Sequence, residues 1–357
     1  MTSHPPSVSS TTATPGVCIA APASGSGKTT IATGLIAALT SRMKVAPFKV
    51  GPDYIDPGYH GIASGCAGRN LDSVLCGNDL IGPLYRHGAQ CADIAVVEGV
   101  MGLFDGRISD GAGSTANIAA ALGIPILLIV DARGMSQSVG AVVRGFATAR
   151  SDVRIAGVIL NKVGSDRHAV VCREAVEAEG IPVVGSIPRQ PDIVVPSRHL
   201  GLVTAIEHGE AALKAIQSME KLIEQTCDVD RISALADCSY AGPAWDPTTV
   251  VDKVGHPTIA MAGGPAFTFG YTEHRELLEA AGATVVVFDP LQDTLPACDG
   301  LIIPGGFPEE HVVELAARQD LRLAIAHMVA DNKPIYGECA GMLWLLETLN
   351  DHPMLGV

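Results

Sequence analysis

The chain has 357 residues, which is more than one ordinary domain usually holds, so its length predicts two compact units. Lys and Arg total 24 against 38 Asp and Glu, a formal net charge of −14. Because no run of basic residues offsets this charge, we expect no binding to nucleic acid and none to anionic membranes.

The N-terminal segment, residues 1–15, is rich in Ser, Thr and Pro. It lacks the basic start and the hydrophobic stretch of a secretory signal, so we expect a disordered tail. The longest apolar run, between Ile118 and Val130, contains Gly and Pro and is too short to span a bilayer. The nine cysteines are scattered without CxxC spacing, which favours a reducing, cytoplasmic compartment without disulfides or structural zinc.

Short apolar runs alternate with helix-like segments over residues 16–235, which is typical of βαβ units around a parallel sheet. The apolar character of the runs is that of buried parallel strands. The predicted strands are Val17–Ala21, Val45–Val50, Ile94–Glu98, Ile126–Asp131, Ile155–Asn161 and Val183–Ile187. The predicted helices are Lys28–Thr40, Asp79–His87, Thr115–Leu122, Ser138–Ala149, His168–Glu179 and Glu207–Thr226.

The alternation breaks over residues 236–256, where Pro, Gly and polar residues predict a linker. A second α/β unit is expected over residues 257–357. Its predicted strands are Thr258–Ala262, Thr284–Phe288, Gly300–Ile303 and Pro334–Gly337, and its predicted helices are Glu273–Ala281, Arg318–Ala330 and Met342–Leu349.

The strongest motif is the segment PASGSGKTT at residues 22–30, between the first strand and the first helix. This is the context of a phosphate-binding P-loop, in which backbone N–H groups curl around phosphates at a helix N-terminus. Lys28 would reach the β- and γ-phosphates, and Thr29 would offer its hydroxyl to Mg²⁺. Pro22 replaces the usual first glycine, so the start of the loop must differ from the standard one.

Four acids follow predicted strands near this loop. Glu98 ends the strand Ile94–Glu98 and precedes the glycine-rich segment GVMGLFDG, which contains Asp105. An acid at this edge of the sheet fits the Mg²⁺-handling acid of a nucleotide site. Asp53 and Asp56 lie between two prolines and could hold a metal or position a substrate. Glu98 could instead be a solvent-facing acid in a turn, and Asp53 and Asp56 could be two solvated turn residues.

Cys339 lies between the predicted strand Pro334–Gly337 and a helix. Such an elbow exposes a side chain at a helix N-terminus, where the thiolate is favoured, so Cys339 is the predicted nucleophile. The alternative is a small buried apolar residue, which is the interpretation of the other eight cysteines. The backbone N–H groups of Gly305 or Gly306 and of Ala340 are predicted to form an oxyanion hole.

Together these segments resemble the cobyrinic acid a,c-diamide synthase family, which includes hydrogenobyrinic acid a,c-diamide synthase. The resemblance implies a P-loop NTPase-like amidoligase domain of the dethiobiotin synthetase type, followed by a class I glutamine amidotransferase domain. The matching segments are SGSGKTT (24–30), KVGPDYIDP (49–57), RNLDS (69–73), VEGVMGLFDG (97–106), GST (113–115), VDARGMSQSV (130–139), GVILNKVGS (157–165), PSRHLGL (196–202), AFTFGY (266–271), PGGFPE (304–309) and GECAGMLWL (337–345).

The resemblance implies a ligase of cobalamin biosynthesis that amidates the a and c carboxylates of cobyrinate or hydrogenobyrinate through acyl phosphates. ATP and glutamine, or ammonia, would be co-substrates, and Mg²⁺ the cofactor. The residues implied for ATP are Gly25, Ser26, Gly27, Lys28, Thr29 and Thr30, with Asn161 and Lys162 at the adenine base. The residues implied for catalysis are Cys339, Asp53, Asp56, Glu98 and Asp105, with Thr29, Asp53 and Glu98 as metal ligands.

Four cations in the matched segments are predicted to pair with the substrate's carboxylates: Lys49, Arg69, Arg107 and Arg198. Each could instead form an ordinary surface ion pair. A homodimer is left open.

Three alternative functions are compatible with parts of the sequence. Cobyric acid synthase amidates other side chains, and the segments GPDYIDP and SRHLGL argue against it. A ParA/MinD-like switch ATPase usually carries a further lysine early in the P-loop, where this chain has Pro22 and Ala23. The third is a non-catalytic remnant. The family implies a catalytic histidine well C-terminal to the cysteine, and His352 lies in a predicted turn, so we expect an amidotransferase domain truncated at its C-terminus.

Overall fold

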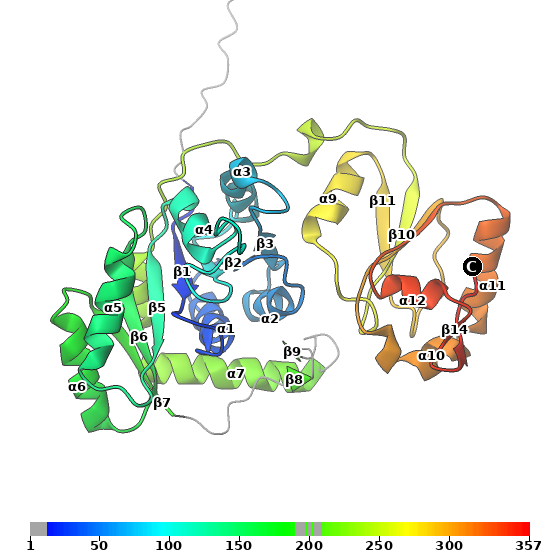
Figure 1. The fold of residues 1–357 in the computed structure, drawn as a ribbon. Helices are drawn as coiled ribbons and strands as arrows, with labels where there is room; N and C mark the ends of the chain where they lie inside the picture. The colour runs from blue at the N-terminus through cyan, green and yellow to red at the C-terminus, as the bar shows by residue number, and fades with distance from the viewer. Residues whose placement is uncertain (1–12, 190–196, 199–200, 203–208) are drawn as a thin grey trace, which may run out of the picture. The chain divides into compact units, whose positions relative to one another are not determined.

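The computed structural model describes residues 13–189, 197–198, 201–202 and 209–357. The chain divides into two units, one containing the described residues up to 189 together with Lys214–Trp245, and one containing Asp246–Val357 together with the described residues of the segment 196–213. Each unit is built on its own parallel sheet (Figure 1). The α/β class predicted from the sequence is confirmed.

The first unit contains a seven-stranded sheet of order β3-β2-β4-β1-β5-β6-β7. All its pairings are parallel, and its strands are almost entirely buried, as the continuous apolar runs require. The strands are β1 (Gly16–Ala20), β2 (Val45–Val50), β3 (Arg69–Leu71), β4 (Ile94–Glu98), β5 (Ile126–Asp131), β6 (Ile155–Val163) and β7 (Val183–Pro188). The described pieces Ser197–Arg198 (β8) and Gly201–Leu202 (β9) are grouped with the second unit, and they pair with each other as antiparallel strands.

Helices cover both faces of this sheet. Right-handed crossovers place α1 and α2 on one face and α3 to α6 on the other, and contacts between α1 and α2, α3 and α4, and α5 and α6 agree with this division (Figure 1). The helices are α1 (Lys28–Thr40), α2 (Ile55–Ser64), α3 (Asn78–Gly88), α4 (Thr115–Leu122), α5 (Ser138–Thr148), α6 (Asp166–Glu177), α7 (Gly209–Thr226) and α8 (Val229–Leu235).

Helix α2 is an element that the sequence analysis missed. Asp53 Oδ1 accepts hydrogen bonds from the backbone N–H of Ile55 at 2.7 Å and of Asp56 at 3.3 Å. These bonds satisfy donors that the first turn of a helix leaves unpaired. Pro57 is tolerated because the first turn needs no N–H from it. A segment that reads as a proline-rich loop therefore starts a helix.

The second unit contains a four-stranded parallel sheet of order β11-β10-β12-β13. One face packs on a core that includes Leu301, Ile303, Ile325 and Trp344. The strands are β10 (Thr258–Ala262), β11 (Thr284–Phe288), β12 (Gly300–Ile303) and β13 (Ile335–Gly337), followed by the hairpin of β14 (Thr348–Leu349) and β15 (His352–Pro353). The helices are α9 (Thr272–Ala280), α10 (Val312–Ala317), α11 (Gln319–Ala330) and α12 (Gly341–Leu345), with 3₁₀ turns η1 (Pro247–Thr249) and η2 (Pro308–Glu310).

Several predicted boundaries need correction. The tail predicted over residues 1–15 is too long at its end, because the Thr14 hydroxyl donates to Ala89 O and the Pro15 carbonyl accepts from Ala95 N. Residues 1–12 lie outside the described residues. The first part of the predicted linker packs on the first unit, where Trp245 is buried against His87.

Two helix predictions also change. The helix predicted over Met342–Leu349 ends at Leu345, because Leu346 is extended and the following residues form the β14–β15 hairpin. Residues 207–208 of the helix predicted to end at Thr226 lie outside the described residues, as do 196 and 199–200 of the segment PSRHLGL. No helix in the described part of the chain is both long and apolar enough to cross a membrane.

The packing of α7 on α1 gives a stability prediction. A Cβ on Gly34 would lie 2.6 Å from the carbonyl oxygen of Met219 in α7. Gly34→Ala should therefore destabilise the unit by about 1–3 kcal/mol through overpacking, although alanine favours helices by about 1 kcal/mol. The matched control is Gly145→Ala in α5, where a Cβ meets nothing within 4 Å. In urea unfolding, the free energy of unfolding should fall for Gly34→Ala and rise slightly for Gly145→Ala. Equal changes in the two variants would contradict this packing.

Candidate active site

The predicted P-loop joins β1 to α1. Gly25 and Gly27 have φ angles of 74° and 95°, in the left-handed region that residues with a Cβ seldom adopt. The Ser26 hydroxyl donates to the Ala23 carbonyl at 2.8 Å and closes the turn. No acidic residue occupies the first turn of α1. The backbone N–H groups at the helix N-terminus therefore face the loop without an acidic side chain in their own turn, which favours binding of an anion.

A buried group of opposite charges lies beside this loop. Lys49 Nζ is 2.6 Å from Asp56 Oδ2 and 2.9 Å from Glu98 Oε1. Lys49 and Glu98 are register partners at the ends of β2 and β4, while Asp56 comes from the first turn of α2. Their exposed fractions are 4%, 5% and 0% for Lys49, Asp56 and Glu98. The topology thus brings together three charged groups that are distant in sequence.

The P-loop is bonded to this charged group through Thr29. The Thr29 hydroxyl lies 2.7 Å from Glu98 Oε1, to which it donates, and 3.3 Å from Asp56 Oδ2. The register of β1 with β4, which pairs Ile19 with Glu98, sets Glu98 beside the loop that follows β1. Thr29, Asp56 and Glu98 therefore present oxygen atoms at one point next to the phosphate loop.

The charges shift one another's protonation. Burial alone would raise the pKa of Glu98, but Lys49 and His60 outweigh it and hold that pKa at about 2. Burial and the neighbouring Glu98 charge raise the pKa of Asp56 to about 6. Burial would lower the pKa of Lys49, yet its two carboxylate partners raise it. At neutral pH Lys49 is thus paired with two carboxylates, of which Glu98 is firmly ionised and Asp56 is closer to its titration range.

His60 is a residue of this site that the sequence analysis missed. It lies on α2 with no exposed surface, and its Nε2 is 2.8 Å from Glu98 Oε2. The signal was its spacing from Asp56, since residues four apart on a helix share a face. Reading residues 49–57 as a loop hid that relation.

Lys28 does not extend freely into the loop. Its Nζ donates to the Met101 carbonyl at 2.5 Å and to the Ala23 carbonyl at 3.3 Å. Met101 has a φ of 47°, and the neighbouring Gly102 N–H donates to Asp105 Oδ2 at 2.9 Å. A phosphate at the loop would therefore compete with two carbonyls for the ammonium, and Asp105 fixes the segment that carries one of them.

Asn161 and Lys162 contact the same loop from the end of β6. Asn161 Nδ2 donates to the Ser26 carbonyl at 2.8 Å. Lys162 Nζ donates to the Gly25 carbonyl at 3.0 Å and to Asp131 Oδ2 at 3.0 Å. Both side chains brace the P-loop, and their contact with an adenine base stays a prediction.

The four cations predicted to meet the substrate lie in different surroundings. Lys49 is held in the buried charged group. Arg69 is in register with Phe48, so its side chain leaves the sheet on the opposite face from Lys49. Arg107 is exposed and paired with Asp110, and Arg198 lies in β8, where only the backbone is described. Their contacts with a substrate stay predictions.

A Mg²⁺ ion would find hard oxygen ligands beside the loop. No group of three or more His, Cys, Asp or Glu side chains in the described residues forms a metal cage. Mg²⁺ usually needs none, because it binds through one or two carboxylates, phosphates and water. The donors Thr29, Asp56 and Glu98 fit such a site. Asp53, a predicted ligand, has Oδ1 occupied by the first turn of α2, so its contact with metal stays a prediction.

Cys339 lies at the turn between β13 and α12 in the second unit. It is exposed and has a φ of 51°, a strained backbone that a nucleophile elbow uses to present its side chain. A Cβ on Gly305 would lie 3.1 Å from Cys339 Cβ and 3.3 Å from its Sγ. The glycine-containing turn after β12 is thus directly beside the sulfur, where the sequence places an oxyanion hole.

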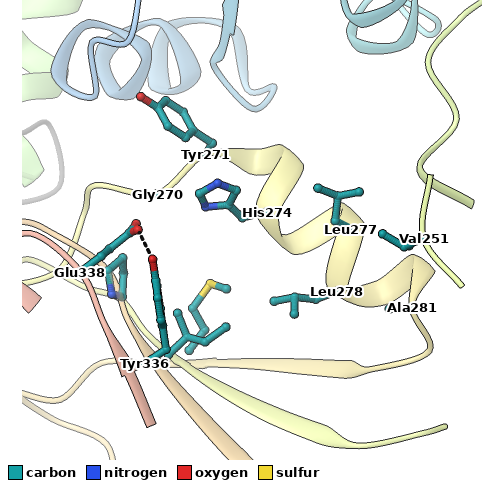
Figure 2. A pocket seen from close by; sticks show the side chains of 12 residues that line it. Val251, Gly270, Tyr271, His274, Leu277, Leu278, Ala281, Tyr336 and Glu338 are labelled. Atoms are coloured by element: carbon teal, nitrogen blue, oxygen red, sulfur yellow. Dashed lines mark hydrogen bonds between the residues drawn. The ribbon is translucent and has the colours of Figure 1, made fainter. Parts of the chain in front are cut away.

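A pocket of about 390 Å³ lies between α9 and the second face of the sheet (Figure 2). Leu277 and Leu278 line it from α9, and Met261 and Ile302 from the strands. Its wall includes Glu338, the residue before the predicted nucleophile, whose Oε2 accepts a hydrogen bond from the Tyr336 hydroxyl at 3.0 Å. A largely apolar cavity therefore adjoins the elbow.

Residues 17–203 match the CobQ/CobB/MinD/ParA nucleotide binding domain, and residues 258–356 match the CobB/CobQ-like glutamine amidotransferase domain. The chain is 54% identical over 350 residues to hydrogenobyrinate a,c-diamide synthase of Mycobacterium tuberculosis, a match of 96% of this chain and 77% of the relative. It belongs to the hydrogenobyrinate and cobyrinate a,c-diamide synthase family. The resemblance seen in the sequence is thereby confirmed.

Two further relatives carry the same family names. Hydrogenobyrinate a,c-diamide synthase of Streptomyces coelicolor is 48% identical, over 97% of this chain and 79% of the relative. Cobyrinate a,c-diamide synthase of Dehalococcoides mccartyi is 42% identical, over 94% of this chain and 74% of the relative. The family's two domain models follow each other in the order of the two observed units.

The buried ion pair of this a,c-diamide synthase family member predicts a pH-dependent effect. Lys49→Met should destabilise the protein by about 3–5 kcal/mol near neutral pH, because it strands buried carboxylates. Without the ammonium, the folded-state pKa values of Asp56 and Glu98 rise. The variant should then lose stability as pH rises toward those values. In the wild type only Asp56, with a pKa of about 6, gives a loss of this kind, and Glu98, with a pKa of about 2, stays ionised.

Urea unfolding at about pH 5 and about pH 7.5 checks this, and the gap between wild type and variant should widen at the higher pH. Lys44→Met, at an exposed position, is the control for loss of a lysine and should change stability by less than about 0.5 kcal/mol. An equal loss for Lys49→Met at both pH values would show that packing, not charge, is responsible.

Proposed function

We propose that the chain is an ATP-dependent ligase that converts the a and c carboxylates of hydrogenobyrinate or cobyrinate to amides, with glutamine or ammonia as nitrogen source, in cobalamin biosynthesis. The observation that carries this proposal is the bond from the P-loop Thr29 hydroxyl to Glu98, in a chain that also presents Cys339 at an elbow. The first site suits phosphoryl transfer and the second suits release of ammonia. The 54% identity to the Mycobacterium tuberculosis hydrogenobyrinate enzyme, against 42% to the Dehalococcoides mccartyi cobyrinate enzyme, favours the metal-free substrate.

The first step is activation of a carboxylate. The acid is already ionised near neutral pH, so no general base is needed. A carboxylate oxygen attacks the γ-phosphorus of ATP, the bond to the bridging oxygen breaks, and ADP leaves behind an acyl phosphate. Lys28 and the loop N–H groups stabilise the charge that develops on the phosphoryl oxygens.

Thr29 and Glu98, with Asp56 beside them, are the residues that would hold Mg²⁺, which supplies charge neutralisation across the phosphates when bound. Asp53 and Asp105 would keep their neighbouring segments in place through the backbone bonds described above. In the second step ammonia attacks the acyl carbon, phosphate departs, and the nitrogen loses a proton. The product is the amide.

The second unit would supply the ammonia. The Cys339 thiolate attacks the side-chain amide carbon of glutamine, the carbon–nitrogen bond breaks, and the nitrogen takes up a proton from solvent and leaves as ammonia. Water then cleaves the thioester to glutamate. The N–H groups of Gly305 or Gly306 and of Ala340 would stabilise the tetrahedral oxyanion, which is supported by the contact between Gly305 and the cysteine.

The proposal also includes the bounds of the two domains and the compartment of the enzyme. We place the ligase domain over residues 16–235 and the amidotransferase domain from residue 257 onward, and we propose a cytoplasmic enzyme. The net charge of −14 supports small-molecule substrates rather than nucleic acid or anionic membranes. The oligomeric state stays a prediction.

Mass spectrometry of the product tests the function. Incubation with ATP, Mg²⁺, ammonium and either hydrogenobyrinate or cobyrinate should give a mass change of two amidations. Lys28→Ala should lower the rate at least about 100-fold with either nitrogen source, since it removes a cation from the transferring phosphoryl group. Product formation by that variant at the wild-type rate would refute the assignment of the P-loop.

Cys339→Ala separates the two units. It should lower glutamine-dependent amidation by at least about 1,000-fold and leave ammonium-dependent amidation within about twofold, because only the first reaction needs the thiolate. Cys298→Ala, at a buried cysteine of the same unit, is the control and should keep both activities. Loss of the ammonium reaction in Cys339→Ala would contradict independent roles for the two sites.

A further inference from the structure

His60 is a buried polar residue to which the mechanism above gives no role. The imidazole has no exposed surface, and neither of its ring nitrogens makes a hydrogen bond of standard geometry among the described residues. A buried polar atom without a partner is costly. The position of the ring therefore calls for a compensating function, and Nε2 is the nitrogen that lies beside a charged group, 2.8 Å from Glu98 Oε2.

The two oxygens of Glu98 have different neighbours. Oε1 accepts from the Thr29 hydroxyl at 2.7 Å and from Lys49 Nζ at 2.9 Å. Oε2 lies 2.8 Å from His60 Nε2, a hydrogen-bonding separation, although neither atom makes a hydrogen bond of standard geometry. The last torsion of a glutamate is broad and roughly two-fold. Contacts at Oε1 alone would leave rotation of the carboxylate about that bond weakly restrained.

His60 can supply a second restraint on rotation of the Glu98 carboxylate. A neutral imidazole carries one N–H, and a hydrogen bond made by one ring nitrogen decides which tautomer is held. No partner at Nδ1 competes for the proton, while a carboxylate lies at Nε2. The arrangement therefore favours the tautomer that donates toward Glu98.

We propose that His60 is a positioning residue that holds Glu98 with Oε1 turned toward the Thr29 hydroxyl, so that Mg²⁺–ATP meets a preset carboxylate oxygen. This inference rests on the proposed function, in which Glu98 is a metal-binding acid. Outer residues that orient a metal-binding carboxylate typically change metal affinity 10- to 100-fold when they are replaced. The alternative is that the His60 side chain only fills space between α2 and the core.

Two substitutions of His60, which place a side-chain N–H group at different positions, distinguish the positioning role from the space-filling role. The amide nitrogen of His60→Gln can occupy the place of Nε2, whereas that of the shorter His60→Asn can reach only the place of Nδ1. The measurement is binding of a fluorescent ATP analogue to the full chain as Mg²⁺ is titrated, with the affinity without Mg²⁺ recorded separately. This readout needs no turnover.

We expect His60→Asn to raise the Mg²⁺ concentration for half-maximal binding at least about 10-fold. The Mg²⁺-free affinity should stay within about threefold, and His60→Gln should restore the Mg²⁺ dependence to within about threefold of wild type. Ala63→Gly, a buried position on the same helix, is the control for loss of α2 stability. It should lower the melting temperature and leave the Mg²⁺ dependence unchanged.

Equal Mg²⁺ shifts in His60→Asn, His60→Gln and Ala63→Gly would overturn the positioning role and leave a structural one. Glu98→Gln, measured alongside, distinguishes this failure from failure of the proposed function. If Glu98→Gln shifts the Mg²⁺ dependence and His60→Asn does not, only the inference about His60 is wrong. If Glu98→Gln has no effect, the metal-binding role of Glu98 is wrong, and the inference falls with it.

Discussion

The buried pairing of Lys49 with Glu98 is the interaction on which the first unit's site depends. Removing either charge from water costs several kcal/mol, and the cost is offset only when the partner is in place. Lys49 and Glu98 come from neighbouring strands in register, so the pair forms only when β2 and β4 are correctly aligned. Assembly of the charged group beside the phosphate loop therefore requires correct alignment of the sheet.

Much of the fold was predictable because its signals are local. Continuous apolar runs mark the strands, and the segment SGSGKTT between a strand and a helix marks the phosphate loop. Cys339 was predicted at an elbow for the same reason, since strand, turn and helix follow one another directly. Its proximity to Gly305 depends in addition on the pairing of β12 with β13, which the sequence shows only through the order of the strands.

The parts that were missed depend on contacts distant in sequence or on an unusual helix start. Pro, Gly and Asp dominate the beginning of α2, so composition indicates a loop there, although Asp53 supplies hydrogen bonds that start the helix. Lys49 looked like a partner for substrate because nothing near it in sequence shows that Glu98 will neutralise it. His60 was overlooked for both reasons.

The contacts of Asn161 and Lys162 with the carbonyls of Ser26 and Gly25 have a thermodynamic consequence for ligand capture. Because side chains from β6 hold the loop in place, the loop loses its conformational entropy during folding and not on ligand binding. An arriving nucleotide then loses little affinity to ordering the protein. Removing these side-chain contacts would lower nucleotide affinity through the entropy cost of ordering the loop, although the atoms that contact the phosphates would be unchanged.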